Sequence, residues 1–206
     1  IMKYILCIVL LMFSIKLNAQ KVVEETIDAN NITTVVIEGD NMFNVKLTSK
    51  PVKTITIKTK SEGEYSKDLV VLTTVKQDSL IISSDFQPLY VNHNDKLSAH
   101  KVVSLETELI IPEHYIVYLK SNIANVTAAG QYKTLILELS QGNCNLKSFE
   151  GNAIVNTIKG HIMLNTNYAI IEAFTKTGAV TQEKITSGNN EIKLNSVNGN
   201  ISITKT

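Results

Sequence analysis

The sequence contains no tryptophan and no arginine, and it has only three prolines and two cysteines among its 206 residues. Lysine supplies all twenty basic charges, and nineteen acidic residues nearly balance them. Nucleic-acid binding is therefore disfavoured, because recognition of phosphates and guanines usually relies on arginine and on a net basic surface. The low glycine and proline content also excludes a collagen-like or disordered class.

Residues 1–19 have the pattern of a secretory signal peptide. Met2 and Lys3 precede an apolar run over residues 4–15, which is shorter than the ~20 residues of a membrane-spanning helix. We expect cleavage after Ala19 and export of a single domain, residues 20–206, to the periplasm, the outer membrane or the cell exterior, with no membrane span. Cys144 is then the one remaining cysteine, so no intramolecular disulfide can form.

Apolar and polar residues alternate along most of the mature chain, and Val, Ile and Thr are frequent. Such a period of two is typical of β-strands, and no window of helical length shows a period of 3.6. We therefore predict an all-β fold whose only helix lies in the signal peptide.

Glycines recur at a fixed spacing in the C-terminal half. Gly142, Gly160 and Gly178 stand eighteen residues apart, and Gly199 opens a fourth phrase of the same kind. Residues at four fixed offsets from this position form columns in which nineteen of twenty members are apolar, where a 44% apolar chain would give about nine. The columns contain Val126, Cys144, Ile162, Val180 and Ile201; Ala128, Leu146, Leu164, Gln182 and Ile203; Leu119, Leu137, Val155, Ala173 and Leu194; and Val117, Leu135, Ala153, Ile171 and Ile192.

This repeat predicts a right-handed parallel β-helix, or β-solenoid, with turns of about eighteen residues over 113–206. Successive turns are expected to stack in chain order, and three extra residues of the last turn fall in the loop 183–190. The glycines mark a corner of each turn, where we expect a positive φ. Residues 20–112 are less periodic and form either irregular first turns of the same coil or a small antiparallel cap.

Several phrases resemble the GIN-type putative autotransporter adhesin head domain family and its adhesin-like relatives among exported proteins of Bacteroidetes. These phrases are ITTVVIEGDNMFNVKLTS, LETELIIPEHYIVYLKSN and the repeated LSQGNCNL, TIKGHIML, TKTGAVTQ and SVNGNISI. The resemblance covers nearly the whole mature chain and implies a β-helical, exported or envelope-associated protein. Unlike relatives with Ser-Gly-Ser-Gly phrases, this chain has other residues before each glycine and Ala124 in place of one. The resemblance transfers no functional residue.

The loop from Asp85 to His100 is the preferred candidate for a binding patch, because it interrupts closely spaced strands and long loops on rigid scaffolds often carry binding residues. The candidate residues in it are Phe86, Tyr90, His93, Asp95 and His100. The two histidines and Asp95 match no familiar zinc signature, so we predict neither a metal site nor a cofactor.

Tyr132 and Tyr168 form a second candidate. They occupy one column two turns apart, about 10 Å by strand spacing, where two rings could stack on sugars, although packing at a corner is the alternative. Cys144 falls in an inward column, so we predict a buried, unreactive thiol.

No pair of acids shares a column of the repeat, whereas glycoside hydrolysis usually needs two carboxylates. We therefore predict a non-enzymatic, exported module that binds a protein or a glycan at the cell envelope, adhesin-like in role. Two alternatives stay open: a carbohydrate-active enzyme with its site in the N-terminal half, and an envelope accessory protein that binds another protein. The C-terminal turn is lightly protected, so an end-to-end homodimer is a further expectation.

Overall fold

The computed structural model describes residues 21–63, 66, 68–87 and 104–206, and every regular element in these ranges is a β-strand. The all-β prediction is therefore confirmed. No helix in this part of the chain is long and apolar enough to cross a membrane. The strands are β1 (Lys21–Asp28), β2 (Thr34–Glu38), β3 (Met42–Lys50), β4 (Thr54–Glu62), β5 (Leu69–Lys76), β6 (Ser79–Phe86), β7 (Ser104–Pro112), β8 (Ile116–Ser121), β9 (Asn125–Gln141), β10 (Cys144–Lys159), β11 (Ile162–Thr166), β12 (Ala169–Thr175), β13 (Val180–Gln182), β14 (Asn190–Asn198) and β15 (Ile201–Lys205).

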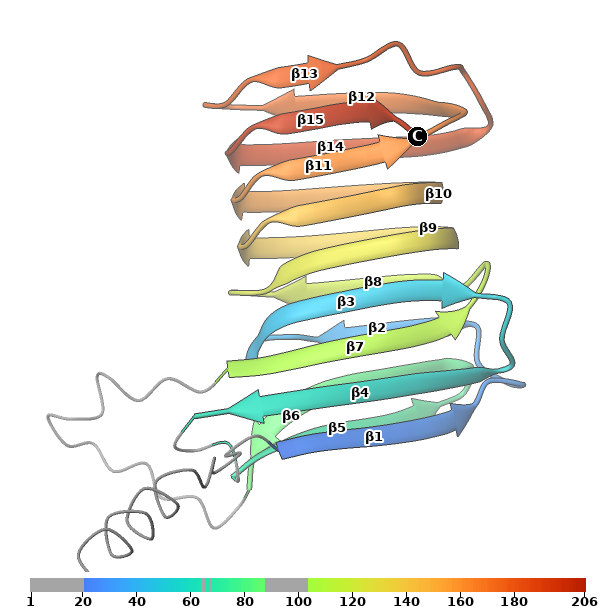
Figure 1. The fold of residues 1–206 in the computed structure, drawn as a ribbon, viewed down its shortest axis with the longest axis vertical. Helices are drawn as coiled ribbons and strands as arrows, with labels where there is room; N and C mark the ends of the chain where they lie inside the picture. Colours follow the sequence, from blue (N-terminus) through green and yellow to red (C-terminus); the bar gives the residue numbers. More distant parts are fainter. Residues whose placement is uncertain (1–20, 64–65, 67, 88–103) are drawn as a thin grey trace, which may run out of the picture.

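The strands form one stack with two faces, joined because the long strands β9 and β10 run through both (Figure 1). The first face has the order β1-β4-β7-β3-β9-β10-β11-β15-β13. The second face has the order β5-β6-β2-β8-β9-β10-β14-β12. Inward-pointing side chains of both faces meet in a continuous apolar core.

Neighbouring strands in the middle of the stack pair in parallel at the spacing that the glycines predict. Val126 pairs with Cys144, and Cys144 pairs with Ile162, so partners stand eighteen residues apart in the chain. All three side chains are almost completely buried. The pleat sends alternate residues to opposite sides, so equal turn lengths align apolar residues into inward ladders.

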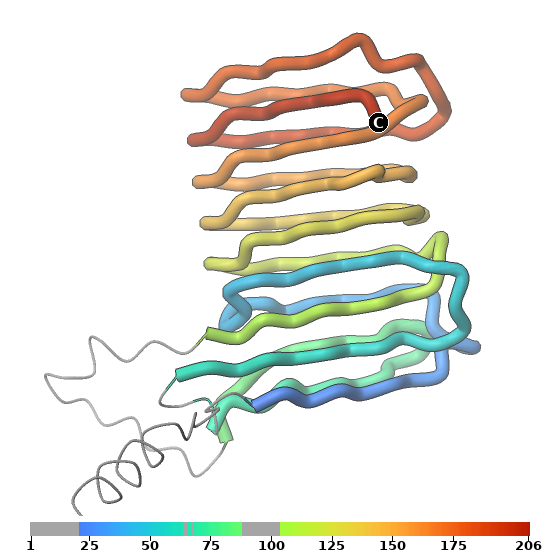
Figure 2. The backbone as a smooth tube through the Cα atoms, viewed as in Figure 1, coloured from blue at the N-terminus to red at the C-terminus, as the bar shows by residue number. Residues whose placement is uncertain are grey.

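The order of the last two layers corrects the sequence prediction. Ile201 pairs with Ile162 on one side and with Val180 on the other. The layer of β14 and β15 therefore lies between β10/β11 and β12/β13, although it follows β13 in the chain (Figures 1 and 2). Stacking in chain order, which the columns predicted, is wrong here, and the exposed end of the stack is β12/β13.

Apolar burial explains this order. The inserted layer brings Ile192, Leu194, Ile201 and Ile203 into the core, each with at most 1% of its surface exposed. The outer layer has smaller or polar residues in three of the four columns, including Gln182, which is exposed. Covering the more apolar layer on both sides removes more apolar surface from water.

The corner glycines are needed for close approach rather than for a left-handed backbone. Of Gly142, Gly160, Gly178 and Gly199, Gly142 alone has a positive φ, at 133°. A Cβ atom on Gly160 would lie well inside van der Waals contact of the Gly142 carbonyl oxygen in the next layer. The expectation of positive φ is therefore corrected for three of the four glycines.

The N-terminal half combines the two arrangements that the sequence left open. Strands β2 and β3 pair in parallel with the regular layers and continue both faces. The far end is antiparallel, with β1 and β4 beside β7 on the first face and β5 beside β6 on the second.

Candidate functional site

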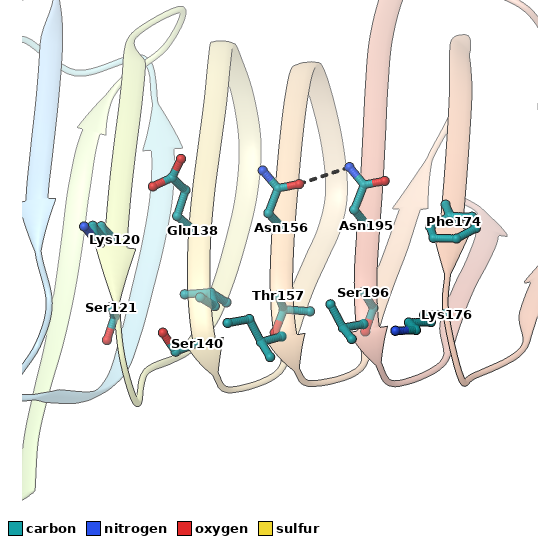
Figure 3. Close-up of a pocket in the computed structure, with 13 residues that line it drawn as sticks. Lys120, Ser121, Glu138, Ser140, Asn156, Thr157, Phe174, Lys176, Asn195 and Ser196 are labelled. Atoms are coloured by element: carbon teal, nitrogen blue, oxygen red, sulfur yellow. Dashed lines mark hydrogen bonds between the residues drawn. The ribbon is translucent and has the colours of Figure 1, made fainter.

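A groove of about 580 Å³ crosses the outer side of the second face. Five neighbouring strands contribute to it, in the order β8, β9, β10, β14 and β12. Because the strands pair in register, the outward-pointing side chains of the lining form two rows that run along the stack, across the strands (Figure 3). The first row contains Lys120, Glu138, Asn156, Asn195 and Phe174, and the second row contains Ser140, Ile158, Val197 and Lys176.

The first row presents planar polar groups. Asn195 Nδ2 donates a hydrogen bond to Asn156 Oδ1 at 3.0 Å (Figure 3). The Tyr118 hydroxyl donates to Glu138 Oε2 at 2.7 Å, and this hydrogen bond to the carboxylate raises the pKa of Tyr118. Within the described residues, Asn156 Nδ2, Asn195 Oδ1 and Glu138 Oε1 have no hydrogen-bond partner. The row therefore offers a ligand one donor group and two acceptors at fixed positions.

Apolar side chains add a second kind of contact. Phe174, Ile158 and Val197 line the groove and are 64%, 52% and 39% exposed. Covering these surfaces with a ligand would release water from them, which favours binding. Lys120 on β8 and Lys176, directly after β12, lie at opposite ends of the groove.

Hydrogen bonds between layers support the end of the groove nearest the glycine corner. The Ser196 hydroxyl donates to the Gly160 carbonyl at 3.0 Å, and the Thr175 hydroxyl donates to the Gly199 carbonyl at 2.7 Å. Each hydroxyl points inward from the strand segment that precedes a corner. These bonds tie β12, β14 and β10 together where the second row stands.

The residues that follow the corner form a further chain of hydrogen bonds. The backbone N–H of His161 donates to Asn143 Oδ1 at 2.8 Å, that of Asn200 donates to His161 Nδ1 at 2.9 Å, and that of Ala179 donates to Asn200 Oδ1 at 3.0 Å. His161 thus accepts through Nδ1 as the neighbouring asparagines accept through Oδ1. The residues in this chain of hydrogen bonds are Asn125, Asn143, His161, Asn200 and Ala179.

The structure separates the residues that the sequence proposed for binding. Phe86 lies at the end of β6, partly buried against the core and outside the groove. Tyr90, His93, Asp95 and His100 fall outside the described residues.

Tyr132 does not present a ring to solvent. It is 2% exposed and stacks on Phe149 with ring centroids 5.5 Å apart, and its hydroxyl donates to the Ala129 carbonyl at 3.2 Å. Burial raises the pKa of this phenol. Tyr132 therefore packs at a corner, which is the alternative that the sequence left open for it.

Tyr168 is 64% exposed, with φ at 55°, and lines a separate depression of about 380 Å³ together with Glu150 and Asn167. The structure therefore does not bring Tyr132 and Tyr168 together as two exposed rings.

Cys144 is buried, as its column predicts, and burial raises the pKa of its thiol to about 12. The thiol is therefore protonated at neutral pH and unreactive.

Sequence reasoning missed the groove, although the signal was present. Glu138, Asn156, Phe174 and Asn195 each stand four residues before a corner glycine, and Ser140, Ile158, Lys176 and Val197 stand two before it. These outward positions repeat with the same period as the inward columns. The period therefore identifies the members of both rows, but not their order along the stack.

Comparisons with known proteins bear on the fold. No protein-family model and no curated protein sequence matches the chain. The structure resembles that of a putative cell adhesion protein from Clostridium sporogenes ATCC 15579, with a TM-score of 0.61, 15% identity, and coverage of 91% of this chain and 100% of that chain. A putative adhesin from Bacteroides fragilis NCTC 9343 matches with a TM-score of 0.36, 12% identity, and coverage of 90% and 97%. A putative lipid binding protein from Parabacteroides distasonis ATCC 8503 matches with a TM-score of 0.31, 11% identity, and coverage of 92% and 95%. At these identities the likeness to the Clostridium protein is one of fold.

Proposed function

We propose that this chain is an exported, non-enzymatic binding module of the cell envelope, adhesin-like in role, that holds an extended glycan in the groove of the second face. The observation that carries the proposal is the pair of rows along this groove, one planar and polar, the other partly apolar. A concave site with apolar surface and a few fixed polar groups is the usual form of a binding site.

The architecture and location in this proposal rest on three supports. Parallel strands at an eighteen-residue spacing favour a β-solenoid of the GIN-type adhesin head class. The leader-like pattern of residues 1–19 favours export. The solved structure with a similar fold bears the name of a putative cell adhesion protein.

Geometry favours a glycan over a peptide. The backbone groups of β9, β10 and β14 beneath the groove pair within the sheet, so a ligand meets mainly side chains. An extended peptide places side chains of one face about 6.8 Å apart, whereas the rows repeat at about 4.8 Å, so the two periods do not match. Sugar hydroxyls can bond the amides and the carboxylate, and the apolar face of a sugar ring can cover Phe174.

The lining favours binding over cleavage. Glu138 is the one carboxylate among the groove residues, and one of its oxygens already accepts the Tyr118 hydroxyl. Hydrolysis of glycosides usually uses two carboxylates on opposite sides of the scissile bond.

The test measures binding of residues 20–206 to a panel of immobilised bacterial and host polysaccharides. Phe174→Ala should weaken binding about tenfold, because a stacked aromatic contributes on the order of 1 kcal/mol beyond its buried area. Ile170→Ala is the matched control, since Ile170 is also exposed on β12 but lies outside the groove. Equal losses for both variants, or no polysaccharide bound, would overturn the groove proposal. Release of reducing ends would overturn its non-enzymatic part, and capture of a single envelope protein in place of a glycan would support the accessory role.

A further inference from the structure

The segment 190–206 occupies a slot between two layers that come earlier in the sequence. β14 pairs with β10 below and β12 above, and β15 pairs with β11 below and β13 above (Figure 1). Both walls of the slot precede this segment in the sequence. The segment pairs with both walls through strand contacts alone, so either the chain's own segment or another copy's can fill the slot.

The contacts in the slot do not depend on which copy supplies the segment. Asn195 bonds Asn156 below, Asn200 bonds His161 below, and the Thr175 hydroxyl above bonds the Gly199 carbonyl. All of these, like the four parallel strand pairings, join residues 190–206 to the rest of the fold without involving the connection between them.

The connection is long, and it is held at two points, where Glu183 bonds Ile203 and Lys205 and where the Ala169 N–H donates to the Thr186 carbonyl. Residues 183–189 separate β13 from β14, whereas two residues, 167–168, make the same crossing between β11 and β12. Seven residues can span about 23 Å when extended, well beyond the ~4.8 Å between layers. Most of this connection is exposed, and Ile185 is its one side chain that packs against the core.

We propose that two copies of this chain exchange residues 190–206, each filling the slot of the other, with 183–189 as the hinge. Exchange of an identical element is a low-cost route to a dimer, because the native contacts are reproduced. In such a dimer each groove is completed by Asn195 and Val197 of the second copy, so the polar and apolar rows become composite. This is a different contact from end-to-end association through β12/β13.

Paired cysteines distinguish the closed from the exchanged form in the full mature chain. Ile154 on β10 and Lys193 on β14 are register partners on the outer surface and lie outside the groove. In I154C/K193C, oxidation after refolding at high protein concentration should give a covalent dimer in the exchanged form and an internally linked monomer in the closed form. Cys144 is buried, with a pKa of about 12, and does not compete.

The matched control is I136C/I154C, whose positions pair between β9 and β10 and never exchange. We expect covalent dimer from I154C/K193C to rise with refolding concentration and to exceed that of the control about fivefold or more. Dimer at control level at every concentration would overturn the proposal.

A hinge variant gives an independent readout. A Cβ at Gly188 would collide with the Tyr168 carbonyl in the closed form, and we expect the hinge of the exchanged form to lead Gly188 away from that carbonyl. Adding G188V to I154C/K193C should therefore raise the dimer share, and an unchanged or lower share of dimer in soluble protein would count against exchange.

Discussion

Two substitutions test the order of the last layers through their stability effects. Leu194 is fully buried, because β14 has a strand on each side. Leu194→Ala should lower the free energy of unfolding by about 3 kcal/mol, within the range for a large-to-small change in a core. Gln182 stands in the same kind of column but is exposed at the end of the stack, so Gln182→Leu should change stability by less than about 0.5 kcal/mol.

Stacking in chain order predicts the opposite pair of results. Leu194 would then lie in the terminal layer, and Leu194→Ala would lower the free energy of unfolding by roughly half as much. Gln182 would lie between Leu164 and Ile203, and replacing a buried amide by leucine would stabilise the protein by about 1–3 kcal/mol. Urea unfolding followed by tyrosine fluorescence and circular dichroism measures both, since the chain has no tryptophan. A small loss for Leu194→Ala together with a gain above about 1 kcal/mol for Gln182→Leu would refute the inserted order.

Two further predictions concern the corners. Gly160→Ala should destabilise the protein by about 3 kcal/mol in urea unfolding, because its methyl group would overlap the Gly142 carbonyl in the next layer. Gly39→Ala, where the nearest atom to the new methyl group is 3.3 Å away, should cost much less, and equal costs would contradict the close-approach explanation. His161→Leu should cost about 1 kcal/mol, because the Asn200 N–H loses the Nδ1 acceptor, whereas His161→Asn should stay within about 0.5 kcal/mol. An equal loss of stability in both His161 variants would contradict a stabilising role for the Nδ1 acceptor.

The two-faced stack was predictable because its causes are local and periodic. Alternation along each strand decides which residues point inward, and turns of equal length place Val126, Cys144 and Ile162 in one ladder. The antiparallel end of the N-terminal half was one of two alternatives, because residues 20–112 have no fixed period to choose between them. The corner geometry was predictable in position but not in cause, since a glycine can serve either positive φ or close approach.

The layer order was not predictable from register, because both orders satisfy it. Placing β12/β13 or β14/β15 on β11 aligns Val180 or Ile201 equally well with Ile162. The difference lies in how much apolar surface is covered. Two signals in the sequence point to it: Gln182 is the one polar member of the columns, and the connection after it is the longest in the repeat.

The same inversion sets the order of the side chains along the groove. In chain order, Phe174 would stand between Asn156 and Asn195, and Lys176 would stand between Ile158 and Val197. The observed order instead places the two amides in direct hydrogen bond and the two aliphatic side chains side by side, with the aromatic ring and the lysine moved to one end. Groups of one kind thus become contiguous along the direction in which an extended ligand would lie. A variant that restored chain order would keep every side chain of the site and still lose its arrangement, so under the proposed function the topology of the last two layers should affect binding as well as stability.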